Sequence, residues 1–477
     1  MKVSPPQFLA LDLGASHGRA LLGTLDGTDL DVEEVHRFET PIIEEGERLF
    51  WDLEALEAEV DTGLHAALDA ATNLRSLSVD AWGVDFVPMD GGGTPLRNPR
   101  AYRDPRTQAA MDETLEEVSR EEIYATTGTQ FMPINTLYQV RADQEMEPEL
   151  VDRTVQRLFI ADYLHYRYSG RGVAELSIAS TAQLMDVRTH EWATDLMERL
   201  DIDPTTWPEI VPPATRIGTF EPPRNSQFEI VAGCSHDTAC AVAGVPAEEE
   251  SSWAYLSCGT WSLLGVERDE PILTDAAREA GYTNELGLDG TVRFLKNLTG
   301  LWVLQECERA WEAAGDPIDY DTLQRRAAAA PAPDGVLDLD EQRFLERGEM
   351  PQKIRRYCRE SSLSVPETKG EVARLILESL AADYQEKLAA LEEIIDEQIE
   401  VLHLVGGGSQ NELLCQWTAE ATGCRVVAGP AEATALGNLL IQARAMGELP
   451  QGWSVRDVVR ANVELQTYDP DSARISA

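Results

Sequence analysis

The chain has 477 residues, too many for one ordinary hydrophobic core, so two domains of similar size are expected. Its formal net charge of −44, from 84 acidic and 40 basic residues, opposes binding to nucleic acid and to an anionic membrane surface. We therefore expect neither a nucleic-acid partner nor a membrane partner.

The first forty residues predict a meander of three short strands. Apolar runs at 8–13, 19–25 and 30–38 are separated by turns that contain glycine. The first run leads Asp12 into a turn of small residues that ends at Arg19.

The small side chains of this turn leave space for a phosphate group. Gly14, Ala15 and Gly18 keep bulky groups away, so backbone N–H groups and the Ser16 hydroxyl could face a phosphate oxygen. Asp12 could then hold a metal ion beside that phosphate. An ordinary glycine-rich hairpin with an aspartate at its entrance is the alternative interpretation.

Two polar segments further along the chain are suited to a sugar. Residues 80–85 place two aspartates and Trp82 around Gly83, and residues 101–107 add two arginines and an aspartate. Polyols need many hydrogen-bond donors and acceptors together with an apolar platform. Either segment could instead be a solvated loop.

The segment Cys234-Ser-His-Asp-Thr-Ala239 contains a candidate general base. Asp237 could accept the proton of a sugar hydroxyl as that oxygen attacks phosphorus, or it could cap a helix that begins near Ala239. Consecutive Ser, His and Asp side chains cannot adopt the geometry of a catalytic triad. Zinc binding by His236 with a neighbouring cysteine lacks evident further ligands.

The polar stretch 245–252 is the best candidate for a domain boundary, which we place near residue 246. The two domains would then be residues 1–246 and 247–477. Beyond the boundary, residues 254–266 predict a strand, a small-residue turn that includes Thr260 and a second strand. The chain thus restarts as it began, which indicates an internal duplication.

The last third of the chain predicts a βαβ unit after a long helix at 371–400. Its parts are a strand at 401–405, a glycine turn at 406–408, a helix at 411–422, a strand at 425–428 and a further helix from Ala433. The glycine turn, with Ser409 and Asn411, is a third candidate phosphate turn, although a purely structural role is the alternative. Neither GxxxxGK[ST] nor GxGxxG occurs, which disfavours a P-loop or a Rossmann nucleotide site.

These motifs together resemble the FGGY family of carbohydrate kinases, and the series runs through nearly the whole chain. The segments that carry the resemblance are Leu11-Asp-Leu-Gly-Ala-Ser-His-Gly-Arg19, Trp82-Gly-Val-Asp-Phe86, Tyr102-Arg-Asp104, Thr127-Gly-Thr-Gln-Phe131, Asn135-Thr-Leu-Tyr-Gln139, Ser235-His-Asp-Thr-Ala239, Ser257-Cys-Gly-Thr-Trp-Ser262 and Gly406-Gly-Gly-Ser-Gln-Asn411. Their order and spacing are most similar to the subgroup that phosphorylates L-rhamnulose. His17 departs from that subgroup, where a second serine is usual, so its contact with phosphate stays open.

The resemblance implies an α/β protein with two ribonuclease-H-like domains, of the actin and sugar-kinase superfamily, around a central cleft. The implied contacts with ATP are Ala15, Ser16, His17, Gly18, Arg19, Thr260, Gln305 and Gly407. The implied contacts with the ketose are Gly83, His236, Thr238 and Asn297, and Asp237 is the implied general base. We add Asp12 as an anchor for Mg²⁺ through water, because a hard cation that bridges phosphates keeps much of its hydration.

The implied reaction converts ATP and L-rhamnulose into ADP and L-rhamnulose 1-phosphate. Another ketose, such as L-fuculose or xylulose, is an alternative substrate, because side chains can accommodate one changed hydroxyl configuration. A non-catalytic sugar- or nucleotide-binding regulator and an actin-type filament protein are further alternatives. Asp237 argues against the first, and the sugar-suited segments argue against the second. No oligomeric state is predicted.

Cysteine usage, hydropathy and charge distribution indicate a cytoplasmic, soluble protein. Seven cysteines form no CxxC pair and are odd in number, which favours reduced thiols. No apolar stretch approaches the roughly 18 residues of a membrane span, and no signal-peptide core precedes the first strand. Carboxylates are spread over a chain that is 43% apolar, which favours a folded protein with an acidic shell adapted to high salt. An acidic mesophilic enzyme is the alternative.

Overall fold

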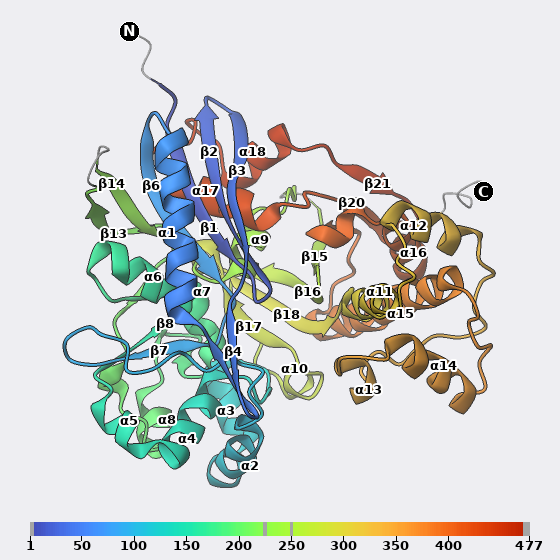
Figure 1. Ribbon diagram of the computed structural model, residues 1–477, viewed down its shortest axis with the longest axis horizontal. Coiled ribbons are helices and arrows are strands. Elements are labelled where there is room, and N and C mark those ends of the chain that lie inside the picture. The colour runs from blue at the N-terminus through green and yellow to red at the C-terminus, as the bar shows by residue number, and fades with distance from the viewer. Residues whose placement is uncertain (1–3, 223–226, 249–250, 471–477) are drawn as a thin grey trace. The chain divides into compact units, whose positions relative to one another are not determined.

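The structure, a computed structural model, describes residues 4–222, 227–248 and 251–470 and divides into two compact units (Figure 1). Unit 1 consists of Met1–Gly244, Glu267–Phe294 and Ala433–Asn462. Unit 2 consists of Val245–Val266, Leu295–Glu432 and Val463–Ala477. The chain first enters unit 2 at residue 245 and later returns to unit 1 twice, so its second half contributes to both units.

Unit 1 is built on a six-stranded sheet with the strand order β13-β14-β6-β1-β2-β3. The strands are β1 (Gln7–Leu13), β2 (His17–Asp26), β3 (Asp29–Glu39), β6 (Leu74–Ala81), β13 (Thr215–Phe220) and β14 (Phe228–Ala232). β1, β2 and β3 are successively antiparallel, whereas β6 runs parallel to β1, and β14 runs parallel to β6. The predicted N-terminal meander is therefore confirmed.

Helices cover both faces of this sheet, as two successive residues of β6 show, since neighbouring side chains of a strand point to opposite faces. Val79 of β6 belongs to a hydrophobic cluster that includes residues of α1 (Leu53–Ala70) and α6 (Ile160–Ser169). Asp80, the next residue, instead accepts a hydrogen bond of 2.5 Å from Asn438 of α17 (Ala433–Ala445). A helix from the end of the chain thus completes unit 1.

Unit 2 contains most of a seven-stranded sheet with the order β17-β18-β16-β15-β19-β20-β21. The strands are β15 (Trp253–Cys258), β16 (Trp261–Arg268), β17 (Thr283–Leu286), β18 (Val292–Thr299), β19 (Val401–Val405), β20 (Arg425–Ala428) and β21 (Gln466–Tyr468). β15 and β16 are antiparallel, β19 is parallel to β15, and β20 is parallel to β19. The order β18-β16-β15-β19-β20 repeats the order β3-β2-β1-β6-β14, as expected for a duplicated ribonuclease-H-like fold.

The late βαβ unit is also confirmed. β19 and β20 have the predicted bounds, and α16 (Glu412–Thr422) connects them. The long helix α15 (Lys369–Ile395) ends earlier than residue 400, because Asp396 adopts the left-handed conformation with φ 52° and its N–H bonds to the Glu392 carbonyl. That bond closes the last helical turn.

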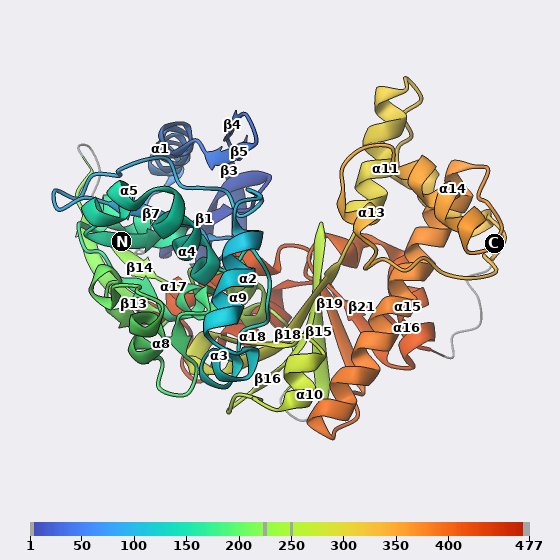
Figure 2. The same ribbon diagram turned by 90° about the horizontal axis from the view of Figure 1, so that it is seen from below.

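The remaining elements are short strands and helices inserted between those of the two sheets. The strands are β4 (Ile42–Glu45), β5 (Arg48–Trp51), β7 (Phe86–Met89), β8 (Gln156–Phe159), β9 (Ala174–Glu175), β10 (Met185–Asp186), β11 (Glu191–Trp192) and β12 (Ile210–Val211). The helices are α2 (Thr107–Glu117), α3 (Arg120–Thr127), α4 (Thr136–Met146), α5 (Pro148–Arg153), α7 (Leu176–Ala179), α8 (Thr194–Arg199), α9 (Asp237–Ala243), α10 (Asp275–Glu279), α11 (Trp302–Ala313), α12 (Tyr320–Ala329), α13 (Gln342–Leu345), α14 (Met350–Glu360) and α18 (Val455–Asn462). Figure 2 shows α11, α13 and α14 gathered in unit 2.

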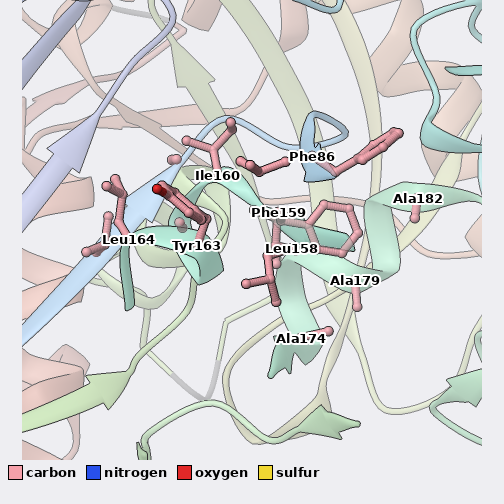
Figure 3. Close-up of a cluster of buried hydrophobic side chains, with 14 of the residues drawn as sticks. Phe86, Leu158, Phe159, Ile160, Tyr163, Leu164, Ala174, Ala179 and Ala182 are labelled. Atoms are coloured by element: carbon pink, nitrogen blue, oxygen red, sulfur yellow. The ribbon is translucent and has the colours of Figure 1, made fainter. Parts of the chain in front are cut away.

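A buried apolar cluster fixes the segment 158–182 in unit 1 (Figure 3). Phe159, Ile160 and Leu164 are at most 1% exposed and belong to the same cluster as Phe86 of β7. This cluster holds α6 and β9 in place, and both elements carry polar residues described below. Among the described residues, no helix combines the length and the apolar character needed to cross a membrane.

Candidate active site

The turn between β1 and β2 is closed by hydrogen bonds and exposed at its tip. The Gly14 N–H donates to the His17 carbonyl at 2.9 Å. Thr40, the residue after β3, holds the turn, since its N–H donates to the Ser16 carbonyl at 3.0 Å and its hydroxyl to the Gly14 carbonyl at 2.6 Å. The side chains of Ser16 and His17 are exposed and accessible to a ligand.

Gly18 has a structural reason to be glycine. It is buried, and a Cβ atom at this position would lie 2.2 Å from the Phe38 ring. Ala15 packs at the margin of the hydrophobic cluster. The hairpin interpretation therefore explains Gly18, while Ser16 and His17 stay as the candidate phosphate contacts.

Asp12 lies at the end of β1, beside Arg19 and beside a second acidic residue. Arg19 Nη2 is 2.5 Å from Asp12 Oδ2, and Asp80 of β6 is the register partner of Asp12. Asp80 is fully buried, and its pKa is raised well above the usual value by burial first and then by the Asp12 charge, with a partial offset from Asn438. No donor among the described residues reaches Asp80 Oδ1.

These carboxylates suit a hydrated cation better than an all-protein metal cage. Within the described ranges, no group of three or more His, Cys, Asp or Glu residues is arranged to hold a metal ion. Mg²⁺ commonly takes one or two carboxylates and completes its shell with water and substrate phosphates. Asp12, with the unsatisfied oxygen of Asp80 nearby, fits that pattern.

Asp237 is the first residue of α9, and the residue before it, His236, has the extended conformation of a helix cap. Its carboxylate accepts hydrogen bonds from the N–H and hydroxyl of Thr238 at 2.5 and 3.1 Å, and Oδ1 lies 3.4 Å from His236 Nε2. The side chain keeps 31% of its exposure. Burial raises the pKa of Asp237, His236 lowers it, and the Asp12 charge raises it further.

His236 connects Asp237 to a buried ion pair. His236 Nδ1 lies 3.3 Å from Glu285 Oε2 and 3.2 Å from Arg293 Nη2. Arg293 is fully buried, and its Nη2 lies 3.2 Å from Glu285 Oε2. The Arg293 and His236 contacts outweigh burial and lower the pKa of Glu285. The Nδ1 edge of the His236 ring is therefore held by Glu285 and Arg293.

The aspartate at the end of the segment 80–85 organises aromatic residues. Asp85 is fully buried, and its Oδ2 accepts from Trp51 Nε1 (2.7 Å), Trp82 Nε1 (3.0 Å) and the Tyr102 N–H (3.0 Å). Its Oδ1 accepts from Gln139 Nε2 (2.8 Å). Burial raises the pKa of Asp85 to about 6 despite these donors. All the hydrogen bonds given for the Asp85 carboxylate are thus to protein donors. The Trp51 and Trp82 rings pack at a tilt of 43° with their centroids 4.3 Å apart.

Gly83 is fixed by a strained turn. Val84 has φ 67°, a genuine outlier for a β-branched residue, and the Asp85 N–H donates to the Gly83 carbonyl at 2.9 Å. Thr181 supports the turn, since its hydroxyl accepts from the Val84 N–H at 3.2 Å. A Cβ at position 83 would lie 2.9 Å from that hydroxyl oxygen.

The segment 101–107 is held by ion pairs. Asp104 is 3% exposed and accepts from the Leu49 N–H at 3.0 Å and from Arg100 Nη1 at 3.3 Å. Arg106 lies 3.7 Å from the same aspartate. The solvated-loop interpretation is therefore wrong for Asp85 and Asp104, because both carboxylates are buried among donors.

Two predicted phosphate turns of unit 2 lie side by side, at the ends of the adjacent parallel strands β15 and β19. A Cβ at Gly408 would lie 2.4 Å from Cys258 Sγ, and Gly406 has φ 80°. Both glycines are thus required by the fold. Gly407 is exposed with no atom near its Cβ position, which leaves its backbone open to a ligand.

The remaining predicted site residues of unit 2 do not all lie together. The Thr260 hydroxyl donates to Gln305 Oε1 of α11 at 3.2 Å, so these two residues are brought together. Asn411 caps α16 by accepting from the Leu414 N–H at 3.0 Å, a structural role. Asn297 lies half-buried on β18.

Sequence reasoning missed a set of buried polar residues that support the unit 1 site. They are Asp162, Glu175, Ser177, Glu285, Arg293 and Asn438, each at most 6% exposed. Asp162 and Arg293 could have been noticed in the sequence as candidate buried polar residues, since both interrupt apolar segments. Nothing in the local sequence shows which residue each would meet.

Comparison with known proteins gives the family. The model of the FGGY family of carbohydrate kinases, N-terminal domain, matches residues 7–244, and that of the C-terminal domain matches residues 254–446. Rhamnulokinases are among the similar proteins: that of Oceanobacillus iheyensis is 37% identical, covering 96% of this chain and 97% of the relative. That of Pectobacterium carotovorum is 40% identical, covering 97% and 93%.

Solved structures share the fold at low sequence identity. The gluconate kinase of Lactobacillus acidophilus has a TM-score of 0.82 at 15% identity, covering 98% of this chain and 94% of that one. The glycerol kinase of Plasmodium falciparum, solved with ADP, has a TM-score of 0.78 at 15% identity, covering 98% and 94%. The two duplicated sheets, the full-length relatives and both family domains agree, and the chain belongs to the FGGY family of carbohydrate kinases.

Proposed function

We propose that this chain is a rhamnulokinase, which transfers the γ-phosphoryl group of ATP to O1 of L-rhamnulose. The proposal rests on the Asp237 carboxylate, which is half-exposed at the start of α9 and oriented by His236 and Thr238. The family and the rhamnulokinase relatives at 37 to 40% identity support the substrate.

In the proposed reaction, Asp237 acts as the general base. Its carboxylate takes the proton of the 1-hydroxyl as that oxygen bonds to the γ-phosphorus, the bond to the bridging oxygen breaks, and ADP leaves. A carboxylate whose pKa is raised holds this proton better than an ordinary surface carboxylate. Gly83, His236, Thr238 and Asn297 are the proposed contacts with the sugar.

The proposed contacts with ATP form two groups of residues. Ala15, Ser16, His17, Gly18 and Arg19 of unit 1 form a phosphate turn, and Thr260, Gln305 and Gly407 of unit 2 contact the nucleotide. Mg²⁺, which would offset charge on the β- and γ-phosphates, is proposed to be anchored by Asp12 through water. Arg19 pairs with Asp12 and is the last residue of the proposed phosphate turn.

The proposed setting is the cytoplasm at high salt. All seven cysteines are free and buried, which suits a reducing compartment where ATP is available. The excess of carboxylates supports adaptation to molar salt. We also propose the division near residue 246 as that between the two family domains, whose matched regions end at 244 and begin at 254.

Production of ADP in the presence of a panel of ketoses, in molar KCl with Mg-ATP, tests this function. L-rhamnulose is expected to give the highest kcat/KM, above L-fuculose and D-xylulose, and the phosphate is expected on O1 by ³¹P NMR. A preference for another ketose would reassign the substrate. ADP release that no sugar stimulates would favour a binding protein.

The Asp237→Asn variant tests the base. It is expected to lose at least about 1000-fold in kcat, since general-base catalysis and the required proton transfer fail together, while its Kd for ATP stays unchanged by calorimetry. Asp26→Asn, an exposed aspartate at the end of β2, is the matched control and should keep full activity. Near-normal turnover by Asp237→Asn would refute this assignment.

A further inference from the structure

The residues before Asp237 form a loop that is held by hydrogen bonds to buried acidic side chains. The Ser235 carbonyl accepts from the Ala81 N–H at 2.9 Å, which attaches the loop to the end of β6. Ser235 is fully buried and His236 is 8% exposed. The position of Asp237 therefore depends on what fixes these two residues.

Glu175 is one of the acids beneath this loop, and it is fully buried. Its Oε2 accepts from the Ser235 N–H at 2.7 Å and from the Ser177 hydroxyl at 2.5 Å. Its Oε1 accepts from the Ser177 N–H at 2.9 Å, and Oε2 is 3.4 Å from the Ile178 N–H. Capping of α7 accounts for the last two contacts, but not for the bond to Ser235.

Ser177 makes a second connection from Glu175 to the loop. Its hydroxyl donates to Glu175 and accepts from the His236 N–H at 3.1 Å. Two successive backbone N–H groups, those of Ser235 and His236, are thus held by Glu175, one directly and one through Ser177. The next residue in the chain is Asp237.

Asp162 of α6 holds the same loop from a second element. Its Oδ1 accepts from the Ser235 hydroxyl at 3.0 Å, and its Oδ2 accepts from the Glu175 N–H at 3.2 Å. His165, one turn further along α6, accepts from the Val79 N–H of β6 at 2.8 Å. Burial lowers the pKa of His165 to about 3, so this ring is neutral and can accept that bond.

We propose that Glu175 is a positioning residue for catalysis, which sets the place of the Asp237 carboxylate through the Ser235 N–H and the Ser177 hydroxyl. The inference rests on the proposed role of Asp237 as the base. Buried acceptors with several donors define a position closely, because each lost bond leaves a polar group unsatisfied in a dry site. A displacement of the base by about 1 Å is enough to lower a rate about 100-fold.

The Glu175→Gln variant tests this role, because its amide offers one acceptor oxygen where the carboxylate offers two. Either the Ser177 N–H, which now donates to Oε1, or the Ser235 N–H, which donates to Oε2, must then face the NH2 group. We expect kcat to fall about 10- to 100-fold, while the Kd for ATP and the number of ATP sites per chain, by calorimetry, stay within about twofold of the parent. A purely structural role would instead reduce the number of ATP sites and leave kcat per site unchanged.

Ser177→Ala gives a second reading if Glu175→Gln does not fold. It removes one connection and keeps the Glu175–Ser235 bond, so a smaller fall in kcat per ATP site is expected. The double variant should lose less than the product of the two single losses, because both act through one network. Glu209→Gln, a largely exposed glutamate paired with Arg171, is the matched control and should be unaffected.

These variants distinguish a failure of the positioning role of Glu175 from a failure of the proposed function. Unchanged kcat per ATP site in both Glu175→Gln and Ser177→Ala, with an inactive Asp237→Asn, would overturn the positioning role and leave the base in place. Activity retained by Asp237→Asn would overturn the base itself.

Discussion

The charges around Asp237 set the proton affinity of the proposed base. Burial and the Asp12 carboxylate raise its pKa, and His236 at 3.4 Å lowers it. His236 is in turn flanked by Glu285 and Arg293. The adjacency of His236 and Asp237 was visible in the sequence, but the ion pair behind the ring comes from strands β17 and β18 and was not.

The pH dependence of kcat follows from these charges. The base must be deprotonated, so kcat is expected to rise with pH along an acid limb whose apparent pKa lies above the usual aspartate value. In His236→Gln the neighbour that lowers the pKa is lost, and the limb should move to higher pH. Initial rates at saturating substrates across the acid and neutral range measure it, with His65→Gln, an exposed histidine of α1, as control. A limb that stays in place or moves to lower pH would contradict this account.

At the scale of elements, the turn after β19 contains glycines with two different roles. The sequence does not distinguish between these roles. Gly408 is required by packing, because a Cβ there would lie 2.4 Å from Cys258 Sγ. Gly407 has free space around it and is the candidate nucleotide contact. The run of three glycines in the sequence does not show which one serves packing and which one could contact the nucleotide. Each role depends on the residues of β15 that lie opposite the turn.

Alanine substitutions should resolve these roles. Gly408→Ala is expected to destabilise the protein by about 1–3 kcal/mol through overpacking. Gly407→Ala should change stability by less than about 1 kcal/mol but raise the KM for ATP severalfold, because its added methyl occupies the open face. Urea unfolding and ATP-dependent kinetics of the two variants give both quantities. Equal stability losses, or an unchanged KM in Gly407→Ala, would contradict the division.

Helix α17 shows how distant sequence completes an element. Asn438 donates to Asp80, and Gln442 donates to the Leu9 carbonyl at 3.0 Å, so this helix binds the two central strands of the unit 1 sheet. Its helical pattern was predicted from Ala433 onward. Its place in unit 1 was not, because polar residues inside a helix do not indicate which strands they will meet.

At the scale of the whole molecule, the net charge of −44 leads us to expect a stability that depends on salt. Repulsion among surface carboxylates acts over about 10 Å at 0.1 M salt and over about 3 Å at 1 M. The melting temperature is therefore expected to rise by several degrees between 0.1 and 2 M KCl. Circular dichroism measures it, and sucrose at matched osmolality should give a smaller rise, since it does not screen charge. A melting temperature independent of KCl would refute the salt adaptation.

The amino-acid sequence was enough to predict the meander, the duplication, the late βαβ unit and the series of motifs that marks the family. These features are local: strands and turns follow from apolar runs and small residues, and the motifs are contiguous. The folded chain was needed to see that Asp85 accepts from four donors and that Gly18 and Gly408 serve packing. It was also needed to see that Glu175 and Asp162 bind the loop that carries Asp237. The reason is that burial and partner choice depend on residues far apart in the chain, which only the folded sheet and its helices bring together.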